Sequence, residues 1–221
     1  MSLRATICIF AKPPVAGQVK TRLAAAVGAD YAAAIAWALL HDTIETALRV
    51  SNTRVILSVT TPFELSPFPE IPQWHQPDGD LGSRVEAILQ RALLDAPYAI
   101  ALGADTPGLP PSAIEAAIKQ LDAADAVLGP TDDGGYYLLG LKRCPDGLLR
   151  DIRWSHAETL VDTVQRLTNW GQSCAFAEPW FDLDTAQDLL RVGSLLTSNT
   201  ISAPRVSLAI AGWLQTGKVR P

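Results

Sequence analysis

The stretch "TICIFAKPPVAGQVKTRL", residues 6–23, sets the fold class of this chain, because a short apolar run leads through a loop containing proline and glycine into a helical segment. The run Thr6–Ala11 has the length and apolar character of a buried β-strand. The segment Lys20–Val27 predicts a helix directly after the loop. Loops that leave the carboxyl ends of parallel strands form the ligand crevice of an open α/β sheet, so this loop is the first candidate for a binding site.

The same alternation of apolar runs and helical segments continues along the chain, and it predicts an α/β fold with a mostly parallel sheet. Further strands are expected at Arg54–Val59, Tyr98–Leu102, Ala126–Gly129, Tyr136–Leu141 and Ser173–Ala177. Further helices are expected at Asp30–Val50, Leu81–Leu94, Pro111–Ala123, His156–Asn169 and Thr185–Leu196. The proline-rich stretch Thr60–Gln73 is expected to pack as an irregular surface segment.

The composition is typical of a globular protein, since 48% of the 221 residues are hydrophobic and 19% are charged. We expect one domain over residues 1–221, because no linker, repeat or low-complexity tract divides the chain. The apolar patch Arg205–Leu214 predicts a terminal helix within a helical extension at about 200–221. This helix would dock either on the body of the protein or on a second subunit of a homodimer.

Three widely spaced cysteines, Cys8, Cys144 and Cys174, form no pattern typical of a disulfide framework or a zinc site, which favours a cytoplasmic location. The first residues lack the pattern of a secretory signal, and the apolar runs are too short for a membrane span. A formal net charge of -5 provides no field that would attract nucleic acid. Any bound phosphate must therefore be held by a local cluster of cations.

Such a cluster lies in the opening loop, which holds two of the five lysines, Lys12 and Lys20, together with Arg22. Backbone amides at the start of the following helix would face the same anion. The loop is not a P-loop, because Val19 rather than glycine precedes Lys20, and no dinucleotide-binding fingerprint follows the strand. We interpret the loop as a phosphate-binding site; the alternative is a solvated basic turn.

Two acidic stretches follow predicted strands, and they predict a site for Mg²⁺ or Mn²⁺. Asp105 in "GADTPGLP", residues 103–110, would hold a hard ion beside the phosphate cradle. Asp182 and Asp184 in "WFDLDTAQDLL", residues 180–190, could bring a second carboxylate to the same ion. The alternative is that Asp105 only caps a turn and that Asp184 is the N-cap of the helix after it.

Two glycine-containing loops are further candidates for ligand contacts. The stretch "GPTDDGGYYLLG", residues 129–140, places two acids and two glycines before a strand, and such residues can accept hydrogen bonds from hydroxyl groups and allow close approach of the backbone. A hairpin turn explains the same residues equally well. The stretch "PDGDLGSRV", residues 77–85, contributes Asp80, Gly82 and Arg84, and it either closes over a nucleotide base or begins a helix.

Taken together, six motifs carry a resemblance to a known family: FAKPPxxGxVKTRL, GDLGxR, GADTPGLP, DDGGYYLLG, IRWS and DLDTxxDL. Their order resembles the bacterial family described as selenodomain-associated transferase 1, or arsenosugar-biosynthesis glycosyltransferase, over residues 4 to about 196. That family is similar to the nucleotide-diphospho-sugar transferases (glycosyltransferase-A fold) and more distantly to phospholactate and molybdenum-cofactor guanylyltransferases. The resemblance implies three layers, α/β/α, around a mixed and mostly parallel sheet.

The resemblance also implies roles for individual residues. The residues at the nucleotide phosphates would be Lys12, Lys20 and Arg22, and those near the base Asp80 and Gly82. The metal ligands would be Asp105 and Asp184. The residues facing the second substrate would be Asp133, Gly134, Gly135 and Tyr136, with Asp105 and Asp133 as the catalytic pair. One departure concerns the metal strand, where sugar transferases of this fold often carry Asp-x-Asp and this chain has Ala104-Asp105-Thr106.

These observations lead us to expect a metal-dependent transferase that moves a sugar from a nucleoside-diphosphate donor to a small acceptor. One alternative is nucleotidyl transfer, in which an NTP is the substrate and pyrophosphate leaves. The other is a nucleotide-binding module without turnover, against which the grouped acids argue. The expected partners are a nucleotide sugar or NTP and a small-molecule acceptor, without nucleic acid. The base, the sugar, the acceptor and the stereochemical outcome stay open.

Overall fold

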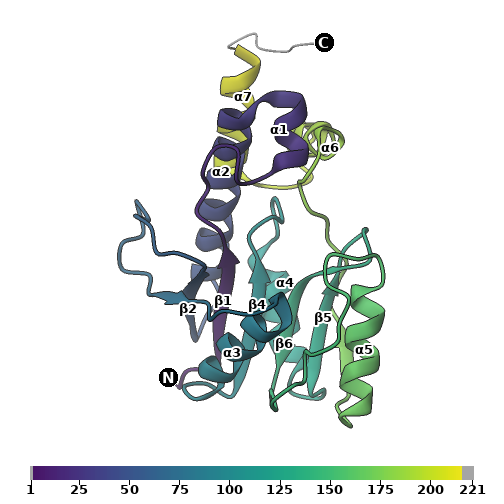
Figure 1. Ribbon diagram of the computed structural model, residues 1–221. Coiled ribbons are helices and arrows are strands. Elements are labelled where there is room, and N and C mark those ends of the chain that lie inside the picture. The colour runs from purple at the N-terminus through teal and green to yellow at the C-terminus, as the bar shows by residue number, and fades with distance from the viewer. Residues whose placement is uncertain (1, 216–221) are drawn as a thin grey trace.

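The computed structural model describes residues 2–215, and these residues build one seven-stranded mixed sheet in the order β3-β2-β1-β4-β6-β5-β7 (Figure 1). The strands are β1 (Ala5–Ala11), β2 (Thr53–Val59), β3 (Gln73–His75), β4 (Tyr98–Gly103), β5 (Ala126–Pro130), β6 (Tyr136–Leu141) and β7 (Cys174–Phe176). Strand β6 runs antiparallel to β4 and β5, and the other paired strands are parallel. The predicted α/β class with a mostly parallel sheet is therefore confirmed.

Helices cover both faces of this sheet, because alternate side chains of the strands are buried on opposite sides. The helices are α1 (Thr21–Val27), α2 (Ala29–Leu48), α3 (Leu81–Leu93), α4 (Pro111–Gln120), α5 (Thr159–Asn169), α6 (Ala186–Thr197) and α7 (Pro204–Gln215). Ile7 and Ile9 of β1 pack with α2 and α4 in one core. Cys8, between them, packs with α3 and α5 in a second core on the other face.

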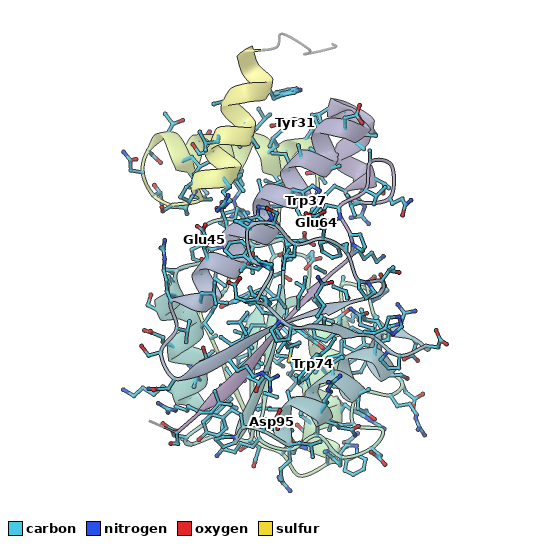
Figure 2. All side chains as sticks on the ribbon, turned by 90° about the vertical axis from the view of Figure 1, so that its left-hand side faces the viewer. Tyr31, Trp37, Glu45, Glu64, Trp74 and Asp95 are labelled. Atoms are coloured by element: carbon cyan, nitrogen blue, oxygen red, sulfur yellow. The ribbon has the colours of Figure 1, made fainter. Side chains whose placement is uncertain are left out.

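A third core joins helices beyond the carboxyl ends of the strands, and we call this unit, made of α1, the first half of α2, α6 and α7, the helical lobe. Figure 1 shows it above the sheet, and Figure 2 shows Tyr31 within it and Trp74 on the sheet body. Tyr31 stacks on Trp213 of α7 with ring centroids 5.0 Å apart. Helix α7 thus docks on α2, which agrees with the expected docking on the body of the protein. Residues 216–221 of the expected extension lie outside the described residues.

The structure adds one strand to the expected elements and shifts the bounds of several helices by up to three residues. Strand β3 has only three residues, which is too short for a periodic pattern in the sequence to predict it. It follows the proline-rich stretch, which is anchored to the core by the buried side chains of Leu65, Phe68 and Ile71. Helix α5 begins at Thr159 rather than at His156, because the Thr159 hydroxyl donates to the carbonyl oxygens of the preceding loop. Within residues 2–215, no helix combines the length and the hydropathy that a membrane crossing requires.

Replacing Asp42 with alanine should destabilise the docking of α7. The buried Asp42 carboxylate accepts hydrogen bonds from the backbone amides of Arg205 and Val206, both at 3.1 Å, at the start of that helix. Loss of such a cap costs about 1–2 kcal/mol. Urea unfolding of Asp42→Ala would measure this loss, with Glu115→Ala on the exposed side of α4 as control. Equal stability of the two variants would contradict the capping role.

Candidate functional site

A pocket of about 530 Å³ opens at the carboxyl ends of β1 to β4, between the sheet and the helical lobe. Its floor is formed by Phe10 and Ala11 at the end of β1. The loop after β1 contributes Lys12 and Lys20, and Asp105 enters from the loop after β4. A pocket of this volume is of the size that holds small-molecule ligands. Its position is the one predicted for the crevice of an open α/β sheet.

The centre of charge in this pocket is Lys20, whose ammonium group lies between two carboxylates. Lys20 Nζ is 2.5 Å from Asp105 Oδ1 and 2.6 Å from Asp184 Oδ1. The lysine side chain is only 5% exposed, while the two acids are 51% and 46% exposed. Burial alone would lower the pKa of Lys20, but the ion pairs with Asp105 and Asp184 outweigh burial and raise that pKa. Lys20 therefore carries its positive charge inside the pocket.

Local backbone structure leaves both acids available for this contact. Helix α6 is capped by Thr185, which forms a capping box with Asp188, so the interpretation of Asp184 as the N-cap was wrong. Helix α4 begins at Pro111 after Pro110 as its N-cap, so Asp105 is not a helix cap. Lys20 itself has a φ of 48°, a left-handed conformation that is uncommon outside glycine. This conformation occurs at the turn from the loop into α1.

Asp182 is a third acid beside this centre. Burial raises its pKa to about 7, the carboxylates of Asp105 and Asp184 add to the rise, and Lys20 opposes it. The negative charge of Asp133, in the turn before β6, raises the pKa of Asp182 further. In the sequence, the alternation of acidic and apolar residues in Asp182-Leu183-Asp184 indicated that the two acids lie on the same side of the chain. The structure shows that Leu183, between them, is fully buried.

Not all of the predicted phosphate and base contacts line the pocket. Lys12 and Lys20 do, but Arg22 lies exposed on α1 and is outside the pocket lining. Asp80 accepts a hydrogen bond from the Ser83 backbone amide at 2.8 Å and is the N-cap of α3, as the alternative interpretation had it. A Cβ atom at Gly82 would lie 2.4 Å from the Leu149 carbonyl oxygen. Glycine at this position therefore permits close packing of α3.

The residues predicted to face the second substrate form the hairpin turn between β5 and β6, which was the alternative for this stretch. Asp133 Oδ1 accepts hydrogen bonds from the Thr131 hydroxyl at 2.6 Å and from the Gly135 backbone amide at 3.0 Å. Gly134 has a φ of 84°, and a Cβ atom there would lie 2.0 Å from a backbone oxygen of the next loop. The Tyr136 ring packs edge-on against Trp154. None of these residues is part of the pocket lining.

Among the polar residues that line the pocket, Thr60 and Gln76 were absent from the sequence-based interpretation. Thr60 follows β2, and Gln76 follows β3, which the sequence analysis did not identify. Gln76 is 7% exposed, and its amide nitrogen donates to the Ser58 carbonyl oxygen at 3.0 Å. Arg84, which was identified within its motif, also lines the pocket. A polar glutamine after a proline-rich stretch gives no signal of burial in the sequence alone.

Gly134→Ala should destabilise the protein if this glycine is needed for close packing of the backbone. The added Cβ would collide with the Ala157 carbonyl oxygen, so we expect a loss of about 2–4 kcal/mol in the free energy of unfolding. Gly171→Ala is the matched control, since Gly171 has a φ of 65° and open space around its Cβ position, which limits the cost to about 1–2 kcal/mol. Similar losses in both variants, measured by urea unfolding, would rule out the close contact.

Comparisons with known proteins show the family and the fold of this chain. A family model described as "Uncharacterized protein conserved in bacteria (DUF2064)" matches residues 43–156. No curated protein matches the sequence significantly. A crystal structure from Desulfovibrio desulfuricans, described as a candidate nucleotide-diphospho-sugar transferase, is similar with a TM-score of 0.82 and 29% sequence identity, over 98% of this chain and 95% of that chain.

Two more distant structures share the fold. One is a 4-diphosphocytidyl-2C-methyl-D-erythritol synthase from Anaerococcus prevotii, with a TM-score of 0.55 and 12% identity over 88% of this chain and 96% of that chain. The other is a 2-C-methyl-D-erythritol 4-phosphate cytidylyltransferase from Thermus thermophilus, with a TM-score of 0.53 and 17% identity over 89% of this chain and 100% of that chain. The predicted nucleotide-diphospho-sugar transferase fold is thereby confirmed.

Proposed function

Since the chain belongs to the bacterial DUF2064 family and has the fold of a nucleotide-diphospho-sugar transferase, we propose that it transfers a glycosyl group from a nucleoside-diphosphate sugar to a small acceptor. The observation that carries this proposal is the ionic centre in which the Lys20 ammonium meets Asp105 and Asp184 at the wall of the pocket. The finer resemblance to the arsenosugar-type glycosyltransferases stays a prediction.

The two ends of the pocket suit the two ends of a nucleoside diphosphate. Lys12, Lys20 and the backbone of the loop after β1 supply positive charge at one end. Gln76, directly after β3, lines the pocket on the side of that strand, and Arg84 lines it from the first turn of α3. Strand β3 is two strands away from β1, which corresponds to about 10 Å at ordinary strand spacing. A diphosphate at the cationic end would place the nucleoside along the carboxyl ends of β1, β2 and β3.

The residues of the pocket favour departure of the diphosphate. In the proposed transfer, the bond between the sugar carbon and the diphosphate oxygen breaks, and the diphosphate leaves with the electron pair. The new bond forms between that carbon and an acceptor hydroxyl oxygen, whose proton passes to the Asp133 carboxylate and from there to water. Lys12 and Lys20 would stabilise the negative charge that develops on the leaving diphosphate. Asp133 is the proposed contact of the acceptor, because its carboxylate can accept a hydrogen bond from a hydroxyl group.

Asp105 and Asp184 are the proposed ligands of a divalent ion, Mg²⁺ or Mn²⁺. In this structure one oxygen of each carboxylate contacts the Lys20 ammonium group, so the two carboxylates lie close enough to share a metal ion. Two carboxylates, completed by phosphate oxygens and water, are a common donor set for a hard ion. Within the described residues, no group of three or more His, Cys, Asp or Glu side chains could hold a metal by itself. This donor set fits an ion that is bound together with the substrate. When bound, such an ion would neutralise charge on the diphosphate.

Asp105→Asn and Asp184→Asn should each weaken Mn²⁺ binding in the presence of a nucleoside diphosphate. Each change removes one negative charge and keeps the size of the side chain, and we expect a loss of about tenfold or more in affinity. The amount of free Mn²⁺, followed by electron paramagnetic resonance, would measure the effect. Asp132→Asn is the control, because Asp132 pairs with Arg191 at 2.9 Å outside the pocket. Unchanged Mn²⁺ affinity in both site variants would exclude these ligands.

Lys20→Met should have two effects of opposite sign. Without nucleotide, Mn²⁺ affinity should rise, because the ammonium group that now pairs with both carboxylates is gone. Binding of a nucleoside diphosphate without metal should weaken by about 1.5–3 kcal/mol, the range for hydrogen bonds to charged groups. Titration calorimetry would measure both, with Lys119→Met on α4 as control, since Lys119 lies outside the pocket. A fall in Mn²⁺ affinity would contradict competition between Lys20 and the ion.

Nucleotidyl transfer is the second candidate, and the names of the two more distant structures favour it. The two reactions differ in the leaving group. Incubation of the protein with Mg²⁺ and a panel of NTPs and nucleotide sugars should release nucleoside diphosphate from a nucleotide sugar if it is a glycosyltransferase. Release of pyrophosphate from an NTP would establish the nucleotidyl reaction instead. Binding without release of either product would leave only a nucleotide-binding module.

A further inference from the structure

A second cavity, of about 320 Å³, lies next to the loop that carries Asp105. Asp105 lines the first pocket, and the next residue, Thr106, lines this cavity. Its walls come from the second half of α2, the loop 106–111 that leads into α4, and the loop 199–204 between α6 and α7. Glu45, labelled in Figure 2, lines the cavity from α2, where the helical lobe meets the sheet. The two pockets share no lining residue, so the cavity is separate from the proposed nucleotide site.

The lining of this cavity is rich in groups that can both donate and accept hydrogen bonds. The hydroxyl-bearing residues are Thr43, Thr46, Thr106, Thr200 and Ser202, and Asn199 adds a side-chain amide. Such a lining suits a ligand whose own groups also act as donors and acceptors, and hydroxyl groups have this property.

Two of these hydroxyl groups are buried without a partner. Thr43 is 5% exposed and Thr106 is 3% exposed, and neither Oγ1 atom forms a hydrogen bond within residues 2–215. A buried hydroxyl without a partner is unfavourable. Thr43 lies on a helix, where a threonine side chain has two ordinary rotamers, so it can turn its hydroxyl toward the cavity that it lines. A ligand hydroxyl there would supply the missing partner.

Trp180 gives the cavity an aromatic wall with a fixed orientation. Its indole Nε1 donates to the Pro107 carbonyl oxygen at 3.1 Å, and its ring stacks on Phe181 with centroids 5.6 Å apart. The face of an aromatic ring is electron-rich and attracts C–H groups. A ligand that carries C–H groups as well as hydroxyls, such as a sugar ring, can therefore use both kinds of wall.

The charges around the cavity balance one another, which favours a neutral ligand. Asp42, Glu45 and Arg49 line the cavity, and Arg205 pairs with Glu45 Oε1 at 2.5 Å. Two acids therefore stand against two arginines. Asp42 is engaged by the backbone amides at the start of α7, whereas Glu45 Oε2 has no partner among the described residues. This oxygen is left to accept a hydrogen bond from a ligand hydroxyl.

We propose that this cavity binds a neutral, polyhydroxylated ligand of the size of one monosaccharide. Hydroxyl groups of the ligand bond to Thr43, Thr46 and Glu45, and its C–H groups contact Trp180. The volume lies at the lower end of the range for small-molecule pockets, which suits a single sugar ring. The site goes beyond the proposed function, because no residue of the nucleotide pocket takes part in it.

Saturation-transfer NMR with D-glucose, D-galactose, D-mannose, D-ribose and myo-inositol, each at up to about 50 mM, tests the proposal. We expect at least one of these probes to bind the wild-type protein. Thr43→Val and Thr46→Val keep the shape of the side chain and remove one hydroxyl, so each should weaken that binding by about threefold to tenfold. Thr43→Val should do so without loss of stability in urea unfolding, because the hydroxyl that it removes has no partner.

Thr168→Val is the matched control, since Thr168 lies on α5 outside the cavity and its hydroxyl bonds to the Val164 carbonyl oxygen at 2.9 Å. This variant should keep the wild-type affinity for the probe. Lys20→Met, in the first pocket, should keep it as well. Absence of binding by all five probes would overturn the proposal. So would binding that Thr43→Val and Thr46→Val leave unchanged, or binding that only Lys20→Met abolishes, which would place the sugar in the first pocket.

Discussion

The ion pairs of Lys20 with Asp105 and Asp184 are the contact on which the pocket depends, because they join parts of the chain that belong to different cores. Lys20 enters from the start of α1, Asp105 follows a strand of the sheet, and Asp184 precedes α6. Without the buried ammonium group, two carboxylates would face each other at short range, which is unfavourable. At this point the helical lobe and the sheet therefore meet through paired charges, in addition to the apolar packing of α2.

Sheet topology explains why this contact can form. Strands β1 and β4 are parallel neighbours, so the loops carrying Lys20 and Asp105 leave the sheet at the same edge. The segment of Asp184 is tied to that edge by the hydrogen bond from the Leu183 backbone amide to the Asp105 carbonyl oxygen, at 3.0 Å. Strands β2 and β3 extend the edge in the other direction and bring Gln76 to the far end of the pocket. The pocket therefore has the ion pairs of Lys20 at one end and the side-chain amide of Gln76 at the other.

The two glycine-containing motifs, at residues 77–85 and 129–140, resemble ligand-binding loops, but their glycines have a structural role. Gly82 and Gly134 each allow a backbone oxygen to approach to a distance that any Cβ atom would forbid. Asp80 caps the helix that carries Arg84, and it is Arg84 that lines the pocket. The conspicuous residues of such a motif can thus hold the backbone in place while a neighbour contacts the ligand.

The sequence by itself determined every helix and six of the seven strands that the structure describes, and it named the candidates Lys12, Lys20, Asp105 and Asp184, because apolar periodicity and position after a strand are local properties. It could not determine that Lys20 lies between two acids, one of them 164 residues away, since such convergence depends on strand order and on the lobe. It did not show β3 or the place of Gln76 in the pocket lining, because that strand is too short for periodicity and is held by long-range packing. Tertiary structure decided these contacts because side chains from distant segments meet only after the sheet has formed.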